Sequence, residues 1–247
     1  MENQILPNDN ALAATPWWKR FALPMAVVAA VLILDQLVKF WIKLTFHYQE
    51  YRPIFGDWSY LYFIENEGMA FGITWGGAMG KLALTLFRLA AVGFIFYWLK
   101  RLLESNAHKG LIVCVAMIMA GAFGNIIDSV FYGVIFSQST GSQLATLFPA
   151  GGGYGTFLHG HVVDMFYFPL WEGYLPQWLP IMGGKYFVFF DAIFNVADAA
   201  ISVGVIAIIL FQSVFFKDEK KAQPATATTV VDEPTESAVD SSSDDTV

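Results

Sequence analysis

The chain has 247 residues, of which 56% are apolar and only 14% are charged. This composition argues against an ordinary soluble domain and favours a membrane protein. The formal net charge of −7 says little about partners, because residues 222–247 hold six acids and no Lys or Arg. Without a basic stripe to neutralise phosphates, we expect no nucleic-acid partner. The single cysteine, Cys114, lies in an apolar run, which excludes an intrachain disulfide and predicts a small core residue.

Four apolar segments are long enough, or nearly so, to cross a hydrocarbon layer of ~30 Å at ~1.5 Å per residue. They lie near 21–42, 82–99, 110–130 and 193–216. The first lacks a small-residue cleavage site and runs past the usual length of a signal-peptide core, so we interpret it as a retained anchor. The predicted fold class is therefore an all-α membrane protein with four transmembrane helices.

The basic residues close to these segments predict their orientation. They precede the first segment, occupy the short connection between the second and third, and follow the fourth: Lys19, Arg20, Lys100, Arg101, Lys109, Lys217, Lys220 and Lys221. Cytoplasmic connections carry an excess of Lys and Arg, so both termini are predicted to be cytoplasmic. The long connections, 43–81 and 131–192, then face the outside.

The predicted organisation has three parts: a cytoplasmic N-terminus (1–20), a membrane domain (21–216) and an acidic cytoplasmic tail (217–247). The tail has too few large apolar residues to fold and is predicted to be disordered. In the first outer loop, "SYLYFIENEGMAFGITW" predicts a small extracytoplasmic β-rich sheet or hairpin. In the second, "GSQLATLFPAGGGYGTFLHG" predicts an irregular, mobile stretch. We also expect a short interfacial helix or loop.

Charged side chains within the predicted spans need a reason, because each costs at least ~2.5–3.5 kcal/mol on insertion scales. Asp35 and Lys39 are spaced i, i+4 with the acid first, which predicts an ion pair that fixes the first helix against its neighbours. Arg88 has a long stem, which predicts that its head reaches back to the outer interface. At that interface, the head of Arg88 would lie where anionic head groups of a substrate pass.

The fourth segment begins with polar residues in the run "FFDAIFNVADAAISVG". If this run is helical at ~100° per residue, then Asp191, Asn195, Asp198 and Ser202 share one stripe. Such a stripe must face protein or water, not lipid. Asp191 would lie near the outer boundary, and Asp198 would be buried in a functional site or against a neighbouring helix.

Two further acids are predicted near the depth of Asp198. Asp128 lies three residues after Asn125 at the outer end of the third segment, and Asp164 lies in "HGHVVDMFYF", where the second outer loop returns to the membrane surface. His159 and His161 beside it raise a zinc site as an alternative, but the HExxH arrangement is missing, so we expect no metal.

Several carboxylates thus converge on one site, without a plausible Ser/His or Cys/His nucleophile. Two acids held close cannot both ionise, so they share a proton. The ionised member then takes a proton from water while the protonated member polarises a carbonyl. The spacing equally allows a proton relay in a transporter or lipid-handling protein. A non-catalytic scaffold would leave the clustering of polar groups unexplained.

Five motifs in order carry a resemblance to a known family: "DQLVK" (35–39), "NEGMAFG" (66–72), "GNIID" (124–128), "VVDMF" (162–166) and "FNVADAAISVG" (194–204). Across about residues 25–215 the chain resembles the lipoprotein signal peptidases, or signal peptidase II. The resemblance implies a monomeric aspartic endopeptidase of the bacterial inner membrane that uses no cofactor. It would cut diacylglyceryl-modified prolipoproteins just before the lipid-modified cysteine, in contact with membrane lipids.

The resemblance also implies roles for individual residues. Asp164 and Asp198 match the family's catalytic pair, and Asp128 matches a supporting residue that is the runner-up for that pair. The other residues implied to bind substrate or support the pair are Asn66, Gly68, Asn125, Asn195, Asp35 and Lys39.

The chain departs from the family's pattern in two places. Ser129 stands where the family usually has Arg, so either Ser129 suffices or another base takes its place. Asp128 and Asp164 are 36 positions apart, much further than usual. The extra length is the Gly-rich stretch, which is predicted to form an added outer-face loop near the entrance to the site.

Overall fold

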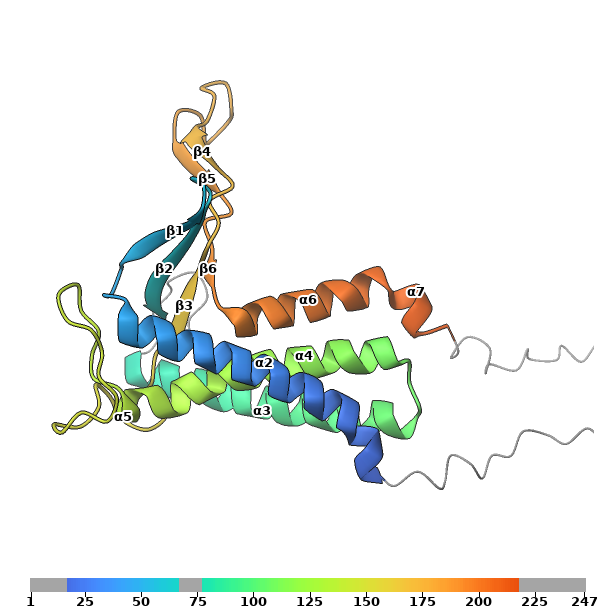
Figure 1. The fold of residues 1–247 in the computed structure, drawn as a ribbon. Helices are drawn as coiled ribbons and strands as arrows, with labels where there is room; N and C mark the ends of the chain where they lie inside the picture. The colour runs from blue at the N-terminus through green and yellow to red at the C-terminus, as the bar shows by residue number, and fades with distance from the viewer. Residues whose placement is uncertain (1–16, 67–76, 218–247) are drawn as a thin grey trace, which may run out of the picture.

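The structure is a computed structural model that describes residues 17–66 and 77–217. Three long helices run alongside one another: α2 (Trp17–Thr45), α3 (Gly77–Glu104) and α4 (Lys109–Ile127) (Figure 1). Within the described residues, three helical stretches are long and apolar enough to span a membrane: Lys19–Thr45, Met79–Glu104 and Lys109–Ile135. They correspond to the first three predicted segments and extend beyond the predicted bounds. The predicted role of Gly68, and the predictions for residues 1–16 and 218–247, lie outside the described residues.

The fourth segment forms a shorter helix than predicted. α6 (Val196–Leu210) has 15 residues and is followed by the short α7 (Gln212–Phe215). At ~1.5 Å per residue, α6 is about 22 Å long, which is less than the hydrocarbon layer. It is an apolar helix that does not by itself meet the length of a span, so a fourth span stays a prediction.

The two long connections form sheets, so the all-α class describes only the helical bundle. A four-stranded antiparallel sheet has the order β1 (Tyr51–Phe55), β2 (Ser59–Asn66), β3 (Val162–Tyr167), β6 (Ile193–Phe194). The β1–β2 hairpin confirms the β-rich prediction for the first loop. β4 (Trp171–Tyr174) and β5 (Tyr186–Phe189) form a second, two-stranded sheet.

The central strand β3 was not predicted. Four of its six residues are buried in a row, so its sequence lacks the alternation of apolar and polar residues that marks a half-buried strand. Its pairing partners are also distant in the sequence, because β2 lies about a hundred residues earlier. A short apolar run of this kind cannot be assigned to strand or helix from its periodicity.

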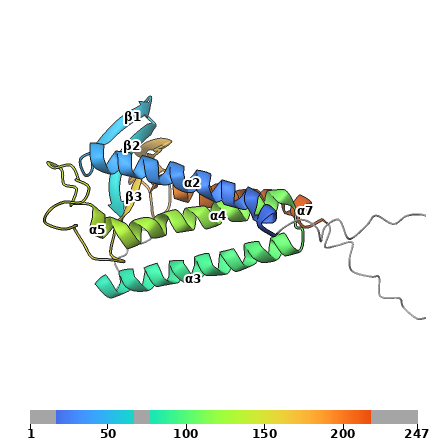
Figure 2. The same cartoon turned by 60° about the horizontal axis from the view of Figure 1, so that its bottom comes forward.

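Helix α4 occupies the middle of the bundle, between α3 and α2, and also packs on α6 (Figure 2). Its contact with α6 is close, because a Cβ atom at Gly121 would lie 2.2 Å from the carbonyl oxygen of Ala197. A side chain of any size there would force the two helices apart. Cys114 is buried on α4, as predicted for a small core residue.

Beyond α4, the chain continues through the π-helical turn η2 (Asp128–Tyr132) and α5 (Gly133–Ile135). An apolar cluster joins these turns and the end of α2 to the inner face of the sheet, with Ile42, Phe63, Tyr132 and Val163 fully buried in it. The loop that follows is irregular, as predicted, apart from a single bridge between Phe136 and Leu147. The cluster fixes β3 to the ends of α2 and α4.

Candidate active site

The two predicted catalytic acids lie on adjacent elements at the end of the bundle that carries the four-stranded sheet. Asp164 is in β3, and Asp198 is the third residue of α6. β3 pairs with β6, which leads directly into α6. Sheet pairing therefore brings together two acids that are 34 positions apart in the sequence.

Two asparagines connect these acids. Asn195 Nδ2 lies 2.7 Å from Asp164 Oδ1 and 3.2 Å from Asn125 Oδ1. Asn125 Nδ2 in turn donates to Asp198 Oδ1 at 2.8 Å. Both amides are buried, so their orientation is fixed by these hydrogen bonds. The predicted supporting residues Asn125 and Asn195 thus contact the predicted pair directly.

The start of α6 sets the position of Asp198. Asn195 is the N-cap: its side chain accepts from the backbone N–H of Asp198 at 2.9 Å, and Asp198 Oδ2 accepts from the N–H of Asn195 at 3.3 Å. This reciprocal pair is a capping box. In "NVAD", Asn195 and Asp198 have the spacing of a capping box, which is a sequence signal that a helix starts here and not at Asp191.

The helical stripe predicted for the fourth segment is therefore wrong at its beginning. Asp191 precedes β6 and accepts from the hydroxyl of Tyr167 at 3.1 Å, in an exposed position. Asp191 does not share a helix with Asp198, and its place at the outer membrane boundary stays a prediction. The helix begins at Val196 because the cap satisfies backbone donors that a longer helix would have used.

Asp164 is buried, with 5% of its surface exposed. Burial, followed by the nearby charge of Asp198, raises the pKa of Asp164 to about 7. Hydrogen bonds from Asn195 and Asn66 act in the opposite direction but do not cancel the effect of burial. Asp164 is consequently able to carry a proton near neutral pH.

Asp198 has a different environment. It is half-buried and accepts two N–H donors, from Asn125 and from the backbone of Asn195, at the positive end of α6. Such donors stabilise a carboxylate. The two acids therefore differ in burial and in the donors that contact them.

Lys39 links the site to the first helix. Its Nζ lies 2.9 Å from Asp35 Oδ2, 2.8 Å from Asp128 Oδ2 and 2.8 Å from Asn125 Oδ1. The ion pair predicted between Asp35 and Lys39 is present, and both side chains are completely buried. Asp35 also accepts from the backbone N–H of Ala197 at 2.9 Å, which ties α2 to the first turn of α6.

Asp128, the runner-up for the pair, is engaged by other groups. Its carboxylate accepts from Lys39, from Gln36 Nε2 at 3.0 Å and from the backbone N–H of Val163 at 3.3 Å. It is fully buried and holds β3 against α4 and α2. This arrangement fits the predicted supporting role.

Ser129 does not replace the arginine expected after the third motif, because its hydroxyl donates to the backbone carbonyl of Asn125 at 3.0 Å. Arg88 interacts electrostatically with Asp198, Asp164 and Asp128, and its side chain is half-buried. The prediction that Arg88 reaches back to the outer interface stays a prediction. A base from α3 supplies positive charge near the acids.

Sequence reasoning missed a second buried charged group on the other side of the sheet. Lys43 pairs with Glu65, which also contacts His161 Nδ1 at 3.2 Å and Ser139 Oγ at 3.0 Å. The ion pair and hydrogen bonds lower the pKa of Glu65 despite its burial. The signal available in the sequence was Lys43 itself, four residues after Lys39 on the same helix face.

Gln36 was also missed. Its amide donates to Asp128, and its carbonyl accepts from the hydroxyl of Tyr132 at 3.1 Å. Within the described residues, no group of three or more His, Cys, Asp or Glu side chains has the arrangement of a metal site. His159 instead bonds to Thr156 and to the carbonyl of Phe157.

Comparisons with known proteins identify relatives of this chain. A family model described as signal peptidase (SPase) II matches residues 27–215. A lipoprotein signal peptidase of Porphyromonas gingivalis is 50% identical over 186 residues, which is 75% of this chain and 80% of the relative. One of Amoebophilus asiaticus is 36% identical over 196 residues, 78% of this chain and 77% of the relative.

A solved bacterial membrane enzyme has the same fold, with a TM-score of 0.51 and 21% identity over 83% of this chain and 94% of that one. The family model covers most of the chain, and so do the relatives. The chain therefore belongs to the signal peptidase II family of lipoprotein signal peptidases.

Proposed function

We propose that this membrane peptidase is an aspartic endopeptidase in which Asp164 and Asp198 activate one water molecule. The substrate would be a diacylglyceryl-modified prolipoprotein, cut on the N-terminal side of the lipid-modified cysteine. The observation that carries the proposal is the bridge of Asn195 and Asn125 between the two carboxylates. It holds both acids in one site in environments that favour one shared proton.

In the proposed reaction, the Asp198 carboxylate takes a proton from water, and the resulting hydroxide adds to the scissile carbonyl carbon. Asp164, whose pKa of about 7 leaves much of it protonated near neutral pH, donates its proton to the carbonyl oxygen. The tetrahedral intermediate then collapses: the C–N bond breaks, the leaving amine takes the proton held by Asp198, and one hydroxyl of the intermediate returns its proton to Asp164 as the new carboxyl group forms. No covalent intermediate forms. The new carboxyl group and amine account for the atoms of the added water.

The surrounding residues would have positioning roles. Asn66 and Asn195 orient the Asp164 carboxyl through hydrogen bonds, while Lys39 orients Asn125. Arg88 supplies positive charge that offsets part of the negative charge developing on the substrate carbonyl. Desolvation of the site strengthens each of these interactions.

We further propose four spans in the bacterial inner membrane, with both termini in the cytoplasm and the site toward the outer face. α6 and α7 together would form the fourth span, because the fifteen residues of α6 leave about 8 Å of the ~30 Å layer for α7 to cover. The basic residues Lys100, Arg101 and Lys217 lie at the end of the molecule away from the sheet, which supports this orientation.

Separate Asp164→Asn and Asp198→Asn variants test the reaction, with Asp191→Asn as the matched control. Each active-site variant should lose at least about 10²–10⁴ in the rate of cleavage of a diacylglyceryl-prolipoprotein, the range that a general acid or base contributes. Asp191→Asn should cleave normally, because this exposed acid contacts only Tyr167 among the interactions described for it. Near-normal cleavage by either active-site variant would rule out the proposed pair.

Mass analysis of the released peptide determines the cut position. The lipid-modified cysteine should become the first residue of the mature product. Proton flux through vesicles without any cleavage would instead support the transporter alternative.

A further inference from the structure

A separate hairpin, formed by residues 168–190, contains β4, β5 and the turn that joins them. We call it the aromatic hairpin. It forms a sheet of its own and extends away from the four-stranded sheet (Figure 1). At one end it follows β3, which carries Asp164, and at the other it leads through β6 into α6, which carries Asp198. The aromatic hairpin is therefore the chain segment that separates the two acids.

The composition of the aromatic hairpin is unusual for a protruding segment. Its 23 residues include only two charged side chains, Glu172 and Lys185. Its tip exposes large apolar groups: Trp178 is 79% exposed and Ile181 is 91% exposed. A patch of this kind on a protein surface marks contact with a partner or a membrane.

The pairing of the strands gives the aromatic hairpin two different faces. Residues directly opposite one another share a face, and faces alternate along each strand. Trp171 pairs with Phe189, and Gly173 with Phe187, so this face carries only apolar side chains. The other face carries Glu172 and a pair of tyrosines, one of which hydrogen-bonds Glu172. One face is thus suited to hydrocarbon and the other to polar head groups.

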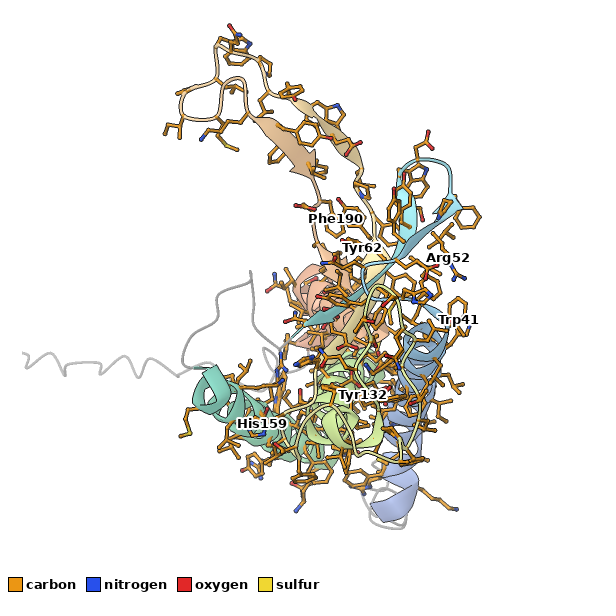
Figure 3. All side chains as sticks on the ribbon, turned by 90° about the vertical axis from the view of Figure 1, so that its left-hand side faces the viewer. Trp41, Arg52, Tyr62, Tyr132, His159 and Phe190 are labelled. Atoms are coloured by element: carbon orange, nitrogen blue, oxygen red, sulfur yellow. The ribbon has the colours of Figure 1, made fainter. Side chains whose placement is uncertain are left out.

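The direction of the aromatic hairpin indicates what it contacts. In Figure 1 it projects across the direction of α2, α3 and α4, near the start of α6 and at the end of the bundle opposite the α3–α4 connection. In Figure 3, where the long helices are seen nearly end-on, it reaches beyond the outline of the bundle, past Phe190 at its base. If the long helices cross a membrane, a segment in that position would lie along the membrane plane and beside the protein.

The irregular loop after α5 provides an internal contrast. It extends beyond the ends of the helices along their own direction (Figure 1), so it would lead away from a membrane that these helices cross. It exposes polar residues such as Ser142, whose hydroxyl is close to that of Thr140. The irregular loop also exposes apolar side chains such as Phe148, so the two segments differ mainly in direction.

We propose that the aromatic hairpin lies in the outer interface of the membrane, with the Trp171–Phe187–Phe189 face and the tip at Trp178 and Ile181 in contact with lipid. Aromatic side chains favour this level of the bilayer. Lipid contact on that side is continuous with the apolar outer surface of α6, where Val203, Ile206 and Ile209 are exposed. The aromatic hairpin would anchor β3 and β6 at the level where a lipid-linked chain is held.

Fluorescent labelling of single cysteines in proteoliposomes tests this inference. Cys114→Ser removes the only cysteine. In that background, Ile181→Cys places an environment-sensitive label on the tip, and Ser142→Cys places the same label on the irregular loop as the matched control. The label at 181 should be quenched by nitroxide lipids and be several-fold less sensitive to aqueous iodide than the label at 142. Equal sensitivity to iodide at both positions, without quenching by nitroxide lipids, would overturn the inference.

Intrinsic fluorescence of the unlabelled protein excludes an effect of the label. Nitroxide lipids should quench the full chain more than the Trp178→Ser variant, and no difference between them would also overturn the inference. Neither readout requires cleavage, so a failure of the proposed reaction would not be mistaken for a failure of lipid contact.

An activity measurement then asks what the contact does. A Trp178→Ser/Ile181→Ser variant should have a raised KM for a lipid-linked substrate in vesicles with an unchanged kcat. A fall in kcat with an unchanged KM would contradict a role in holding the protein at the lipid surface.

Discussion

The side-chain amide of Asn195 lies 2.7 Å from a carboxylate oxygen of Asp164. The same residue caps α6 through its other amide atom, which accepts from the backbone N–H of Asp198. Asn195 therefore positions one acid directly and the other by fixing the first turn of its helix. This double role makes the two functions separable by mutation.

Asn195→Ser should retain much of the cap and lose the contact with Asp164, because serine is a good N-cap but too short to reach that carboxyl. A hydrogen bond to a charged group contributes about 1.5–3 kcal/mol, so cleavage should fall by about tenfold to a hundredfold. Asn195→Ala should lose a similar factor in activity and a further ~0.5–2 kcal/mol of stability. Cleavage rates and thermal unfolding in detergent measure the two effects. Full activity of Asn195→Ser would show that the bridge does not position Asp164.

The pH dependence of cleavage should have a falling limb with an apparent pKa near 7. Burial and the charge of Asp198 raise the pKa of Asp164 to about 7, and the proposed reaction needs its proton. The value belongs to the coupled pair and not to one acid alone. A profile that stays flat from pH 6 to pH 9 would contradict the assignment of Asp164 as the proton donor.

The same shift predicts a change in stability. The pKa of Asp164 rises from 3.8 to about 7 on folding, so the folded state binds the proton more tightly than the unfolded state. Stability is therefore lost as the pH rises from about 4 through about 7. Asp164→Asn removes the ionisable group, and its melting temperature relative to that of the natural chain should be higher at pH 8 than at pH 5. Equal differences at the two pH values would show that the carboxyl is not shifted.

Lys39→Met should destabilise the protein by about 3–5 kcal/mol, the cost of leaving buried charges without their partner. Asp35 and Asp128 both pair with Lys39 and are fully buried. Lys100→Met is the matched control, since Lys100 and Glu104 form an exposed pair of the same i, i+4 spacing. Thermal unfolding should show that Lys100→Met lowers the free energy of unfolding by at most ~1 kcal/mol. Replacing both acids by Asn in the Lys39→Met background should recover part of the loss, and no recovery would contradict the explanation.

Gly121→Ala should separate α4 from α6. A Cβ atom there would lie 2.2 Å from the carbonyl oxygen of Ala197, and a backbone atom cannot move away without shifting the helix. Overpacking costs about 1–3 kcal/mol, and cleavage should fall because Asn125 and Asp198 lie on these two helices. Gly93→Ala on α3 is the control, because a Cβ atom there meets nothing within 4 Å. Similar melting temperatures for both variants would show that the helices tolerate more separation than their contact suggests.

Sequence patterns alone located three helices, the ion pair of Asp35 with Lys39 and the β-hairpin of the first outer loop. These features depend on local properties, namely runs of apolar residues, i, i+4 spacing and β-branched or aromatic content. The order of five motifs also assigned the family. None of these signals carries information about which distant segments pair.

The tertiary structure decided how the site is assembled. β3 pairs with β2 and β6, and only that pairing brings Asp164 beside Asn195 and the first turn of α6. It also brings Arg88 into electrostatic interaction with the acids and pairs Asp128 with Lys39. Asp191 contacts Tyr167 and does not belong to the helix that carries Asp198. Contacts between residues far apart in the sequence follow from packing and strand register, because each local segment is compatible with several partners until the apolar core selects one.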